Sequence, residues 1–334
     1  MTDIHLTMGI YDYDHVRDLF TGRVKPEGVE LTCLVMPVWE TFYRFFRDQE
    51  WDVSELSFAG AVQAIDRGEA PFVLIPVFPS RLFRHSGIYI RADGPIKRPE
   101  DLSGARIGIA QWAQTATAYI RGWMTDSLGI QLTDVDWYQL GPDSPGRLDN
   151  SVEQPPEGVR LTNLPNGSLA EMVVDGKLDA FLSAAPPQLF LDGDPRIKRL
   201  FPDYEGVERD YFKATGIYPI MHTVAIRRSS YEANPWIAGN LLAAFEAAKN
   251  RSVERMHDMD VSQIALPWIQ AAIERDTKLF FPDGDYWPYG IERNRTTIEA
   301  FLKFCHDQRI TKRRLAPEDI FVKEAREPFR MLQV

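Results

Sequence analysis

The alternation of short apolar strands with helix-patterned segments most restricts the fold of this chain. The runs IHLTMGI (4–10) and VELTCLVM (29–36) are strand-like and flank a helix-patterned segment, with Pro26 and Gly28 at a turn. A second set begins at RIGIA (106–110) and ends at DAFLSAA (179–185). Helices that alternate with strands in this way predict an α/β fold with open, largely parallel sheets.

Two such blocks predict a two-lobed chain. The blocks join near Ala92, and the chain returns near residues 220–226, so two extended crossover strands link the lobes. We place the first lobe at residues 1–92 plus 224–334, the second at 93–223, and a ligand cleft between them. Three helix-patterned segments dominate the last third and predict a helical C-terminal part: 235–250, 261–275 and 294–308. One larger doubly wound domain with a helical tail is the alternative.

A group of cations stands out in an acidic chain. The formal net charge is −10, yet Arg81, Arg84 and His85 fall within five positions, and no Asp or Glu occurs from Ala70 to Ala92. Guanidinium groups match carboxylates in bidentate geometry and stay charged when desolvated. The sequence therefore predicts an anion site, whereas ion pairs with distant acids are the structural alternative.

The overall composition narrows the class of ligand and the compartment. An estimated pI near 5.2 argues against a nucleic-acid binder and favours a small molecule. The amino terminus carries acids where a secretory signal has a basic start, and no stretch approaches the roughly 20 apolar residues of a membrane span. We expect a cytoplasmic protein without membrane contact, with Cys33 and Cys305 as quiet thiols. The oligomeric state is open, and a homo-oligomer is possible.

Several segments together resemble the 4,5-dihydroxyphthalate decarboxylase family. They cover nearly the whole chain and are, in order, PVFPSRLFRHSGIYI, PEDLSGARIGIAQWAQTATAYIRG, GKLDAFLSAAPP, TGIYPIMH and DGDYWPYGIERNR. The resemblance implies a type II periplasmic-binding-protein-like fold in an intracellular carboxy-lyase that needs no organic cofactor. Its substrate would be a small aromatic diacid, a dihydroxylated phthalate that loses one carboxylate to give a dihydroxybenzoate. A solute-binding or sensing protein of the same fold is the alternative.

Such a decarboxylation needs an acid that protonates the ring carbon, clamps for two carboxylates and contacts to the hydroxyls. Arg81 and Arg84 are the predicted clamps. His85 adjoins them, and His222 falls at the second crossover, so both histidines are candidate acids. As alternatives, His85 is a satisfied structural histidine beside a strand, and His222 is a strand histidine bonded to the backbone.

Polar residues near two strand ends are further candidates. Asp14 follows the first strand and is suited to orient a histidine or to accept a bond from a ring hydroxyl, although it also suits a helix cap. His15 is a predicted substrate contact. In the family an Arg and a Thr commonly follow this Asp, whereas His15 and Val16 stand here. Glu55 and Ser57 precede an apolar helix, where they either contact a hydroxyl or cap the helix.

The second block and the carboxyl-terminal region add three substrate contacts. Thr115 begins a helix whose first backbone amides can bind a carboxylate. Tyr286 and Trp287, in the run DYWPYG, are suited to wall an aromatic ligand, with core packing as the alternative.

Motifs for cofactors are missing from the sequence. It contains no phosphate-binding glycine loop, no paired-cysteine motif and no nucleophile elbow, and the acids and histidine at 12–15 lack the spacing of a ligand signature. We therefore predict neither an organic cofactor nor a metal, and a metal held by residues 12–15 is the alternative.

Overall fold

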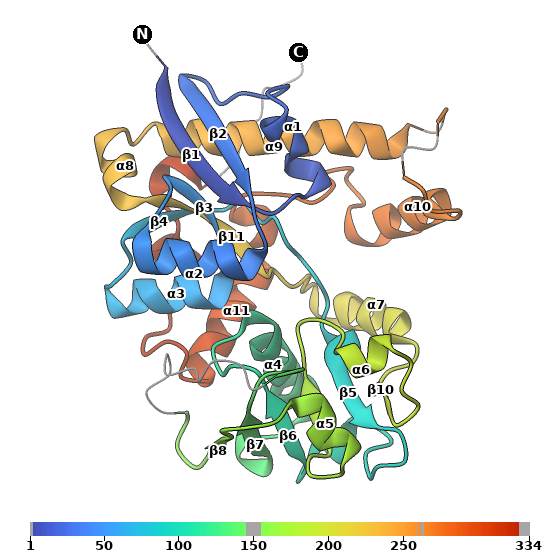
Figure 1. The fold of residues 1–334 in the computed structure, drawn as a ribbon. Helices are drawn as coiled ribbons and strands as arrows, with labels where there is room; N and C mark the ends of the chain where they lie inside the picture. The colour runs from blue at the N-terminus through green and yellow to red at the C-terminus, as the bar shows by residue number, and fades with distance from the viewer. Residues whose placement is uncertain (1–2, 145–154, 259, 262–263, 327–334) are drawn as a thin grey trace.

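The computed structural model describes residues 3–144, 155–258, 260–261 and 264–326. Its strands form two mixed sheets, which lie in the upper and lower halves of Figure 1. The first sheet has the order β2 (Val29–Val35), β1 (Ile4–Ile10), β3 (Val53–Ser57), β11 (His222–Arg227) and β4 (Phe72–Ile75). The second has the order β10 (Ile197–Arg199), β5 (Ile88–Arg91), β9 (Ala180–Leu182), β6 (Arg106–Ile109), β7 (Asp136–Gln139) and β8 (Arg160–Asn163).

Helices cover both sheets, as the alternating pattern predicted. Around the first sheet lie α1 (Arg17–Phe20), α2 (Val38–Asp48), α3 (Phe58–Arg67), α8 (Arg228–Ala233) and α9 (Ile237–His257). Around the second lie α4 (Thr115–Leu128), α5 (Leu169–Val174), α6 (Gln188–Leu191) and α7 (Tyr204–Thr215). The remaining helices are α10 (Ile269–Phe280), α11 (Arg295–Asp307) and α12 (Pro317–Ile320). Short 3₁₀ turns include η1 (Asp14–Val16) and η2 (His85–Gly87).

The chain passes between the two sheets twice, at residues 76–87 and 216–221. The two crossovers run antiparallel and bridge at Arg81 and Ile220. The carbonyl of Ser80 accepts the N–H of Met221 at 2.8 Å. Two extended crossovers were predicted, but β5 pairs with β9 and β10 in the second sheet, so the first crossing comes before the predicted boundary at residue 92.

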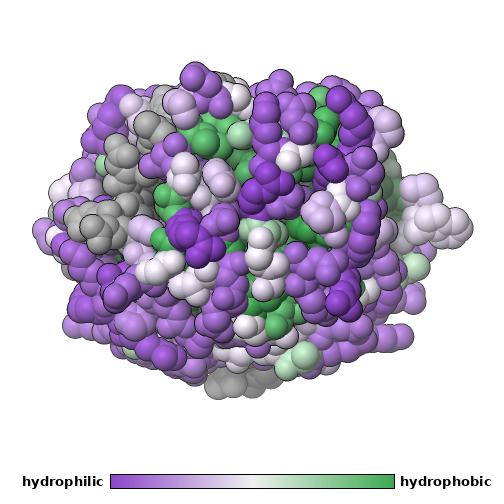
Figure 2. Space-filling view, turned by 90° about the horizontal axis from the view of Figure 1, so that it is seen from below, coloured by the Kyte–Doolittle hydropathy of each residue, from purple (hydrophilic) through white to green (hydrophobic). Residues whose placement is uncertain are grey.

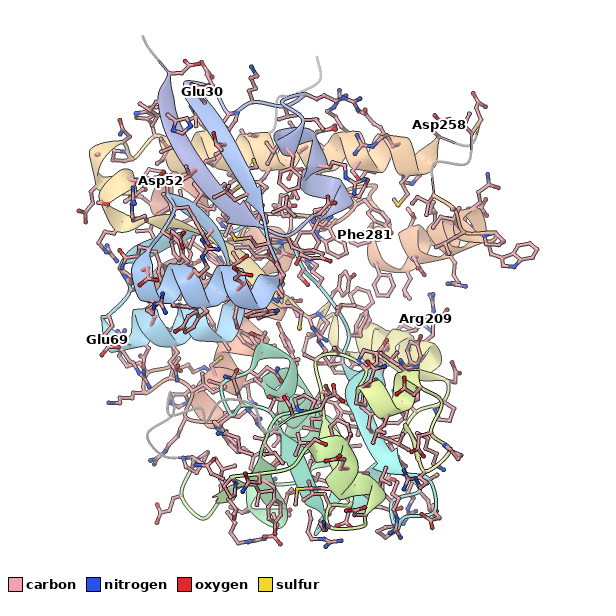
Figure 3. The ribbon with its side chains drawn as sticks, in the orientation of Figure 1. Glu30, Asp52, Glu69, Arg209, Asp258 and Phe281 are labelled. Carbon is pink, nitrogen blue, oxygen red and sulfur yellow. The ribbon has the colours of Figure 1, made fainter. Side chains whose placement is uncertain are left out.

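The C-terminal helices contact both halves of the molecule. On α11, the ring of Phe301 stacks on Tyr119 of α4 with centroids 4.7 Å apart. Arg209 of α7 pairs with Asp276 of α10 at 2.6 Å, and Figure 3 labels Arg209 and Phe281 where these two helices meet. The C-terminal helices thus touch helices of the second half as well, and the assignment of residues 224–334 to the first lobe stays a prediction. Residues 327–334 lie outside the described residues.

The structure also corrects one predicted helix. In the described part of the segment predicted over 261–275 the helix begins at Ile269, because Pro267 removes a backbone donor and disfavours the helical conformation of the residue before it. No helix of the described ranges is long and apolar enough to cross a membrane. Seen from below, the lower half is mostly hydrophilic, and its hydrophobic residues show in small separate groups (Figure 2).

Candidate active site

A buried carboxylate on β3 organises the candidate site. The side chain of Glu55 is fully buried and accepts three hydrogen bonds: from the backbone N–H of Tyr11 at 3.0 Å, the Tyr13 hydroxyl at 2.6 Å and Nδ1 of His222 at 2.6 Å. An ionised carboxylate only accepts, so Nδ1 of His222 carries a proton. Nε2 has no protein partner in the described part of the chain and is the nitrogen that can exchange a proton with a ligand.

Strand pairing brings this pair together at a crossover. β11 runs antiparallel to β3, with His222 opposite Ser57 and Val224 opposite Glu55. His222 is the first residue of β11, directly after the second crossover, and its N–H also bonds to the carbonyl of Ser80 at 3.3 Å. The acid–base pair is therefore fixed where the two halves of the molecule join.

Five rings form an aromatic row through the site, in the order Phe42, His222, Tyr13, His15 and Trp287. Phe42 meets His222 edge-on at 4.9 Å, and the Tyr13 oxygen lies 3.3 Å from Nδ1 of His222. Centroid distances are 5.4 Å from Tyr13 to His15 and 5.3 Å from His15 to Trp287. Burial, with the Glu55 carboxylate adding to it, raises the pKa of Tyr13 well above its usual range. Burial lowers the pKa of His15 to about 4, so its imidazole is neutral.

Two helix starts meet beside this row. Thr115, the first residue of α4, accepts the backbone N–H of Ala59 in the first turn of α3 at 3.0 Å, and its hydroxyl lies 3.0 Å from that of Ser57. The hydroxyl that caps α3 thus comes from a helix of the other half. Unsatisfied amides at helix starts attract anions, so both helices direct partial positive charge to this place.

Arg84 and a small cavity lie on the other side of the second crossover. Arg84 donates to the Ala184 carbonyl at 2.8 Å and to the sulfur of Met221 at 2.9 Å, and it forms no ion pair with the residues that the structure describes. The cavity has room for about one water molecule. Its lining is Arg84, His85, Tyr119, Ile120, Trp123, Tyr211 and Pro219.

Curated relatives identify this chain. It is 32% identical to a 4,5-dihydroxyphthalate decarboxylase of Comamonas testosteroni over 332 residues, which cover 99% of this chain and 100% of the relative. A 4,5-dihydroxyphthalate decarboxylase of Pseudomonas putida is 34% identical over 215 residues, 64% of this chain and 83% of the relative. The chain belongs to the 4,5-dihydroxyphthalate decarboxylase family. No family model matches the sequence.

Membership of the 4,5-dihydroxyphthalate decarboxylase family confirms the predicted enzyme class, a carboxy-lyase. Solved structures confirm the predicted fold. The periplasmic aliphatic sulphonate binding protein SsuA of Escherichia coli superposes with a TM-score of 0.55 at 12% identity, covering 100% of this chain and 96% of that one. The alkanesulfonate-binding protein SsuA of Xanthomonas axonopodis pv. citri superposes with a TM-score of 0.51 at 14% identity. The superposition covers 96% of this chain and 99% of that one.

The structure of this family member brings together six of the predicted site residues. They are His15, Glu55, Ser57, Thr115, His222 and Trp287. Glu55 was expected to contact the substrate, but it is fully buried and holds His222. Tyr13 was missed by the sequence analysis. Its position in YDYDH, two residues beyond Tyr11 after the first strand, is the only sequence signal that could have indicated it.

Asp14 and Tyr286 do not join the aromatic row of this carboxy-lyase. The Asp14 carboxylate is largely exposed and is bound by Ser252, Arg17 and Arg255, because η1 turns it away from the site. A catalytic role of Asp14 stays a prediction, and among the described residues the acids and histidine at 12–15 form no cluster that could hold a metal ion. Tyr286 packs against Phe281 with ring centroids 4.2 Å apart.

Arg81 and His85 are buried in separate surroundings. Arg81 donates to the carbonyl of Pro288 at 3.0 Å and to the side chain of Asn294, and it lies against the rings of Phe78, Tyr218 and Trp287. These contacts hold the 288–294 segment, and the role of Arg81 as a carboxylate clamp stays a prediction. His85 has no hydrogen bond at either ring nitrogen, and burial lowers its pKa to about 4. A neutral imidazole with no proton to spare is a poor candidate acid.

Proposed function

We propose that this chain decarboxylates a dihydroxylated phthalate, converting 4,5-dihydroxyphthalate into 3,4-dihydroxybenzoate and carbon dioxide, without a metal or an organic cofactor. The hydrogen bond between the buried Glu55 and His222 carries the proposal. It supplies the one group that this reaction requires beyond binding, an oriented proton donor with a free Nε2. The names of the two curated relatives support the substrate.

In this mechanism His222 is the acid. Its protonated Nε2 delivers a proton to the ring carbon that bears the leaving carboxylate, and the Glu55 carboxylate stabilises the imidazolium beforehand. A hydroxyl para to that carbon donates electron density, which forms a dearomatised intermediate. The carbon–carbon bond to the carboxylate then breaks, carbon dioxide leaves, and the bonding pair restores the aromatic ring. Solvent returns a proton to His222.

Binding of the diacid uses the free cation and the helix starts. Arg84 forms no ion pair in the described part of the chain and faces the carbonyl of Ala184 in the loop after β9. The first amides of α4 supply further donors for a carboxylate, whereas in α3 the N–H groups of Phe58 and Ala59 already bond to Met221 and Thr115. Because Ser57 and Thr115 are in direct contact here, entry of a flat diacid between them requires the two halves to part and close again.

Turnover of 4,5-dihydroxyphthalate tests the proposal. Purified protein should release 3,4-dihydroxybenzoate and carbon dioxide in equal amounts, measured by chromatography and a coupled carbon dioxide assay. The activity should survive dialysis against EDTA. His222→Asn should lower kcat by about 10²- to 10⁴-fold with binding retained. His306→Gln, on the exposed face of α11, is the matched control.

One outcome would favour the alternative class of protein. Tight binding of 4,5-dihydroxyphthalate in calorimetry, with no product after prolonged incubation, would identify a solute-binding or sensing protein of the same fold. Loss of activity on EDTA treatment and its return with a divalent metal would refute the cofactor-independent mechanism alone.

A further inference from the structure

His15 combines three features that the proposed mechanism has not used. It stands in the aromatic row between Tyr13 and Trp287. Its Nε2 is buried without a hydrogen-bond partner. Its other polar contact is a hydrogen bond to the backbone of Pro79. Buried polar atoms are almost always paired, so an orphan nitrogen in a candidate active site needs an explanation.

The contact with Pro79 defines the tautomer of His15. Proline has no backbone N–H, so its only backbone hydrogen-bonding group is the carbonyl, which accepts. The donor must be Nδ1 of His15, because Nε2 has no partner. In a neutral ring the proton on Nδ1 leaves Nε2 with a free lone pair. His15 is therefore built as an acceptor at Nε2.

His222 has the complementary arrangement. Its Nδ1 donates to a carboxylate where Nδ1 of His15 donates to a carbonyl, and Nε2 is the nitrogen left to exchange a proton with a ligand. Tyr13 separates the two histidines, with its hydroxyl at His222 and its ring against His15. The charged groups that act on His15 are Asp14, Glu55 and Lys249, and none of them replaces its missing partner. Two imidazoles on either side of one ring, one held by a carboxylate and one by a carbonyl, suit an acid and a base in one reaction.

We propose that His15 is the base that receives the proton of the substrate's ring hydroxyl while His222 protonates the ring carbon. This inference rests on the proposed decarboxylation. The hydroxyl para to the leaving carboxylate gives its proton to Nε2 of His15 as the ring carbon takes the proton of His222, and a ketone-like oxygen forms. When the carbon–carbon bond breaks, its electron pair restores the ring, the oxygen takes the proton back from His15, and carbon dioxide leaves.

This assignment defines the substrate class more closely. In the proposed step His15 accepts the proton of a ring hydroxyl while His222 protonates the ring carbon para to it. The site therefore requires an aromatic acid with a hydroxyl para to the carboxylate that leaves. A phthalate without hydroxyls can occupy the carboxylate contacts but has no group for His15.

Two variants at position 15 test the role. His15→Phe keeps a ring between Tyr13 and Trp287 but removes both nitrogens, and His15→Gln returns a polar amide without a base. Binding of 4,5-dihydroxyphthalate and of plain phthalate is measured by calorimetry, together with kcat. In the wild type the dihydroxylated acid should bind more tightly than phthalate. In His15→Phe this preference should disappear, phthalate affinity should be unchanged, and kcat should fall by about 10²-fold or more. Relative to His15→Phe, His15→Gln should restore more of the binding preference for the dihydroxylated acid than of kcat.

The outcomes separate this inference from the function on which it rests. If His15→Phe keeps both the preference for hydroxyls and its turnover, the role of His15 is refuted while the decarboxylation stands. An equal loss of affinity for both acids would show that His15 only packs the site, which also overturns the inference. If the wild type binds both acids without turnover, the proposed decarboxylation fails. The difference in affinity between the dihydroxylated acid and phthalate then still shows whether His15 contacts the hydroxyl. His306→Gln again serves as the exposed histidine control.

Discussion

Replacing His85 should remove a large part of the acid sensitivity of folding. Its side chain is 5% exposed and is enclosed by the rings of Trp123, Phe201 and Tyr211. Neither ring nitrogen has a hydrogen bond, and the carboxylate of Glu208 is 3.9 Å from Nδ1, beyond hydrogen-bond range. Burial lowers the pKa of His85 from its usual value of 6.5 to about 4.

The sign and size of the effect follow from linkage. The folded pKa lies below the unfolded one, so the neutral ring stabilises the fold fully above pH 6.5, and this stability is lost as the pH falls towards 4. Between pH 7 and pH 5 the unfolded chain binds on average about two thirds of a proton more at this position than the folded one. The loss over that interval is about 2 kcal/mol, since one pH unit is worth about 1.4 kcal/mol for a full proton.

His85→Phe fills the same aromatic surroundings with a ring that cannot ionise. The free energy of unfolding, measured in urea at pH 7 and pH 5, should fall by about 2 kcal/mol less in the variant than in the wild type. At pH 7 the variant should also be the more stable, by about 1–3 kcal/mol, because it buries no unpaired nitrogen. Equal pH dependence in the two proteins would show that His85 is solvated or paired in solution and would refute the burial argument.

Three other substitutions test different parts of the structure. Glu55→Gln should lower kcat about 10- to 100-fold, because it replaces a charge-assisted hydrogen bond to His222 with a neutral one. Steady-state kinetics should show this fall in kcat with little change in KM. Arg84→Met should raise KM for the diacid at least about 10-fold, and an unchanged KM would exclude Arg84 as a clamp. Gly122→Ala should destabilise the fold by about 1–3 kcal/mol, because the added Cβ would lie 2.5 Å from the ring of Phe304. This steric clash outweighs the stability that alanine usually adds over glycine in a helix. Thermal unfolding compares it with Ser127→Ala on the exposed side of α4, which should be nearly neutral.

Local patterns in the sequence were sufficient to predict most elements of the fold. β4 is an apolar run because both its faces are buried, and α3 and α11 have apolar residues at helical spacing because each packs on one side. α7 was missed although Val207, Tyr211 and Phe212 follow helical spacing, because charged residues separate its apolar ones and only Tyr211 is buried. β10, three residues long, is too short to give a pattern.

The site was predictable only in part, because its contacts are distant in sequence. Glu55 and His222 are 167 residues apart, and they meet because β11 inserts between β3 and β4. No local pattern specifies that pairing. The Arg81, Arg84 and His85 cluster was conspicuous by charge, yet burial of Arg81 and His85 gives both a structural environment. Composition shows that cations are present, whereas packing decides which of them reach a ligand.

The Thr115 hydroxyl accepts a hydrogen bond from the first turn of α3, so that turn reports whether the two halves are in contact. When the halves part, the amide of Ala59 loses its acceptor and opens to solvent, so its hydrogen exchange should accelerate while amides in the middle of α3 stay protected. A bound diacid that bridges the two helix starts would slow that exchange again. One backbone amide thus offers a label-free readout of substrate capture, independent of any chemistry at the ring.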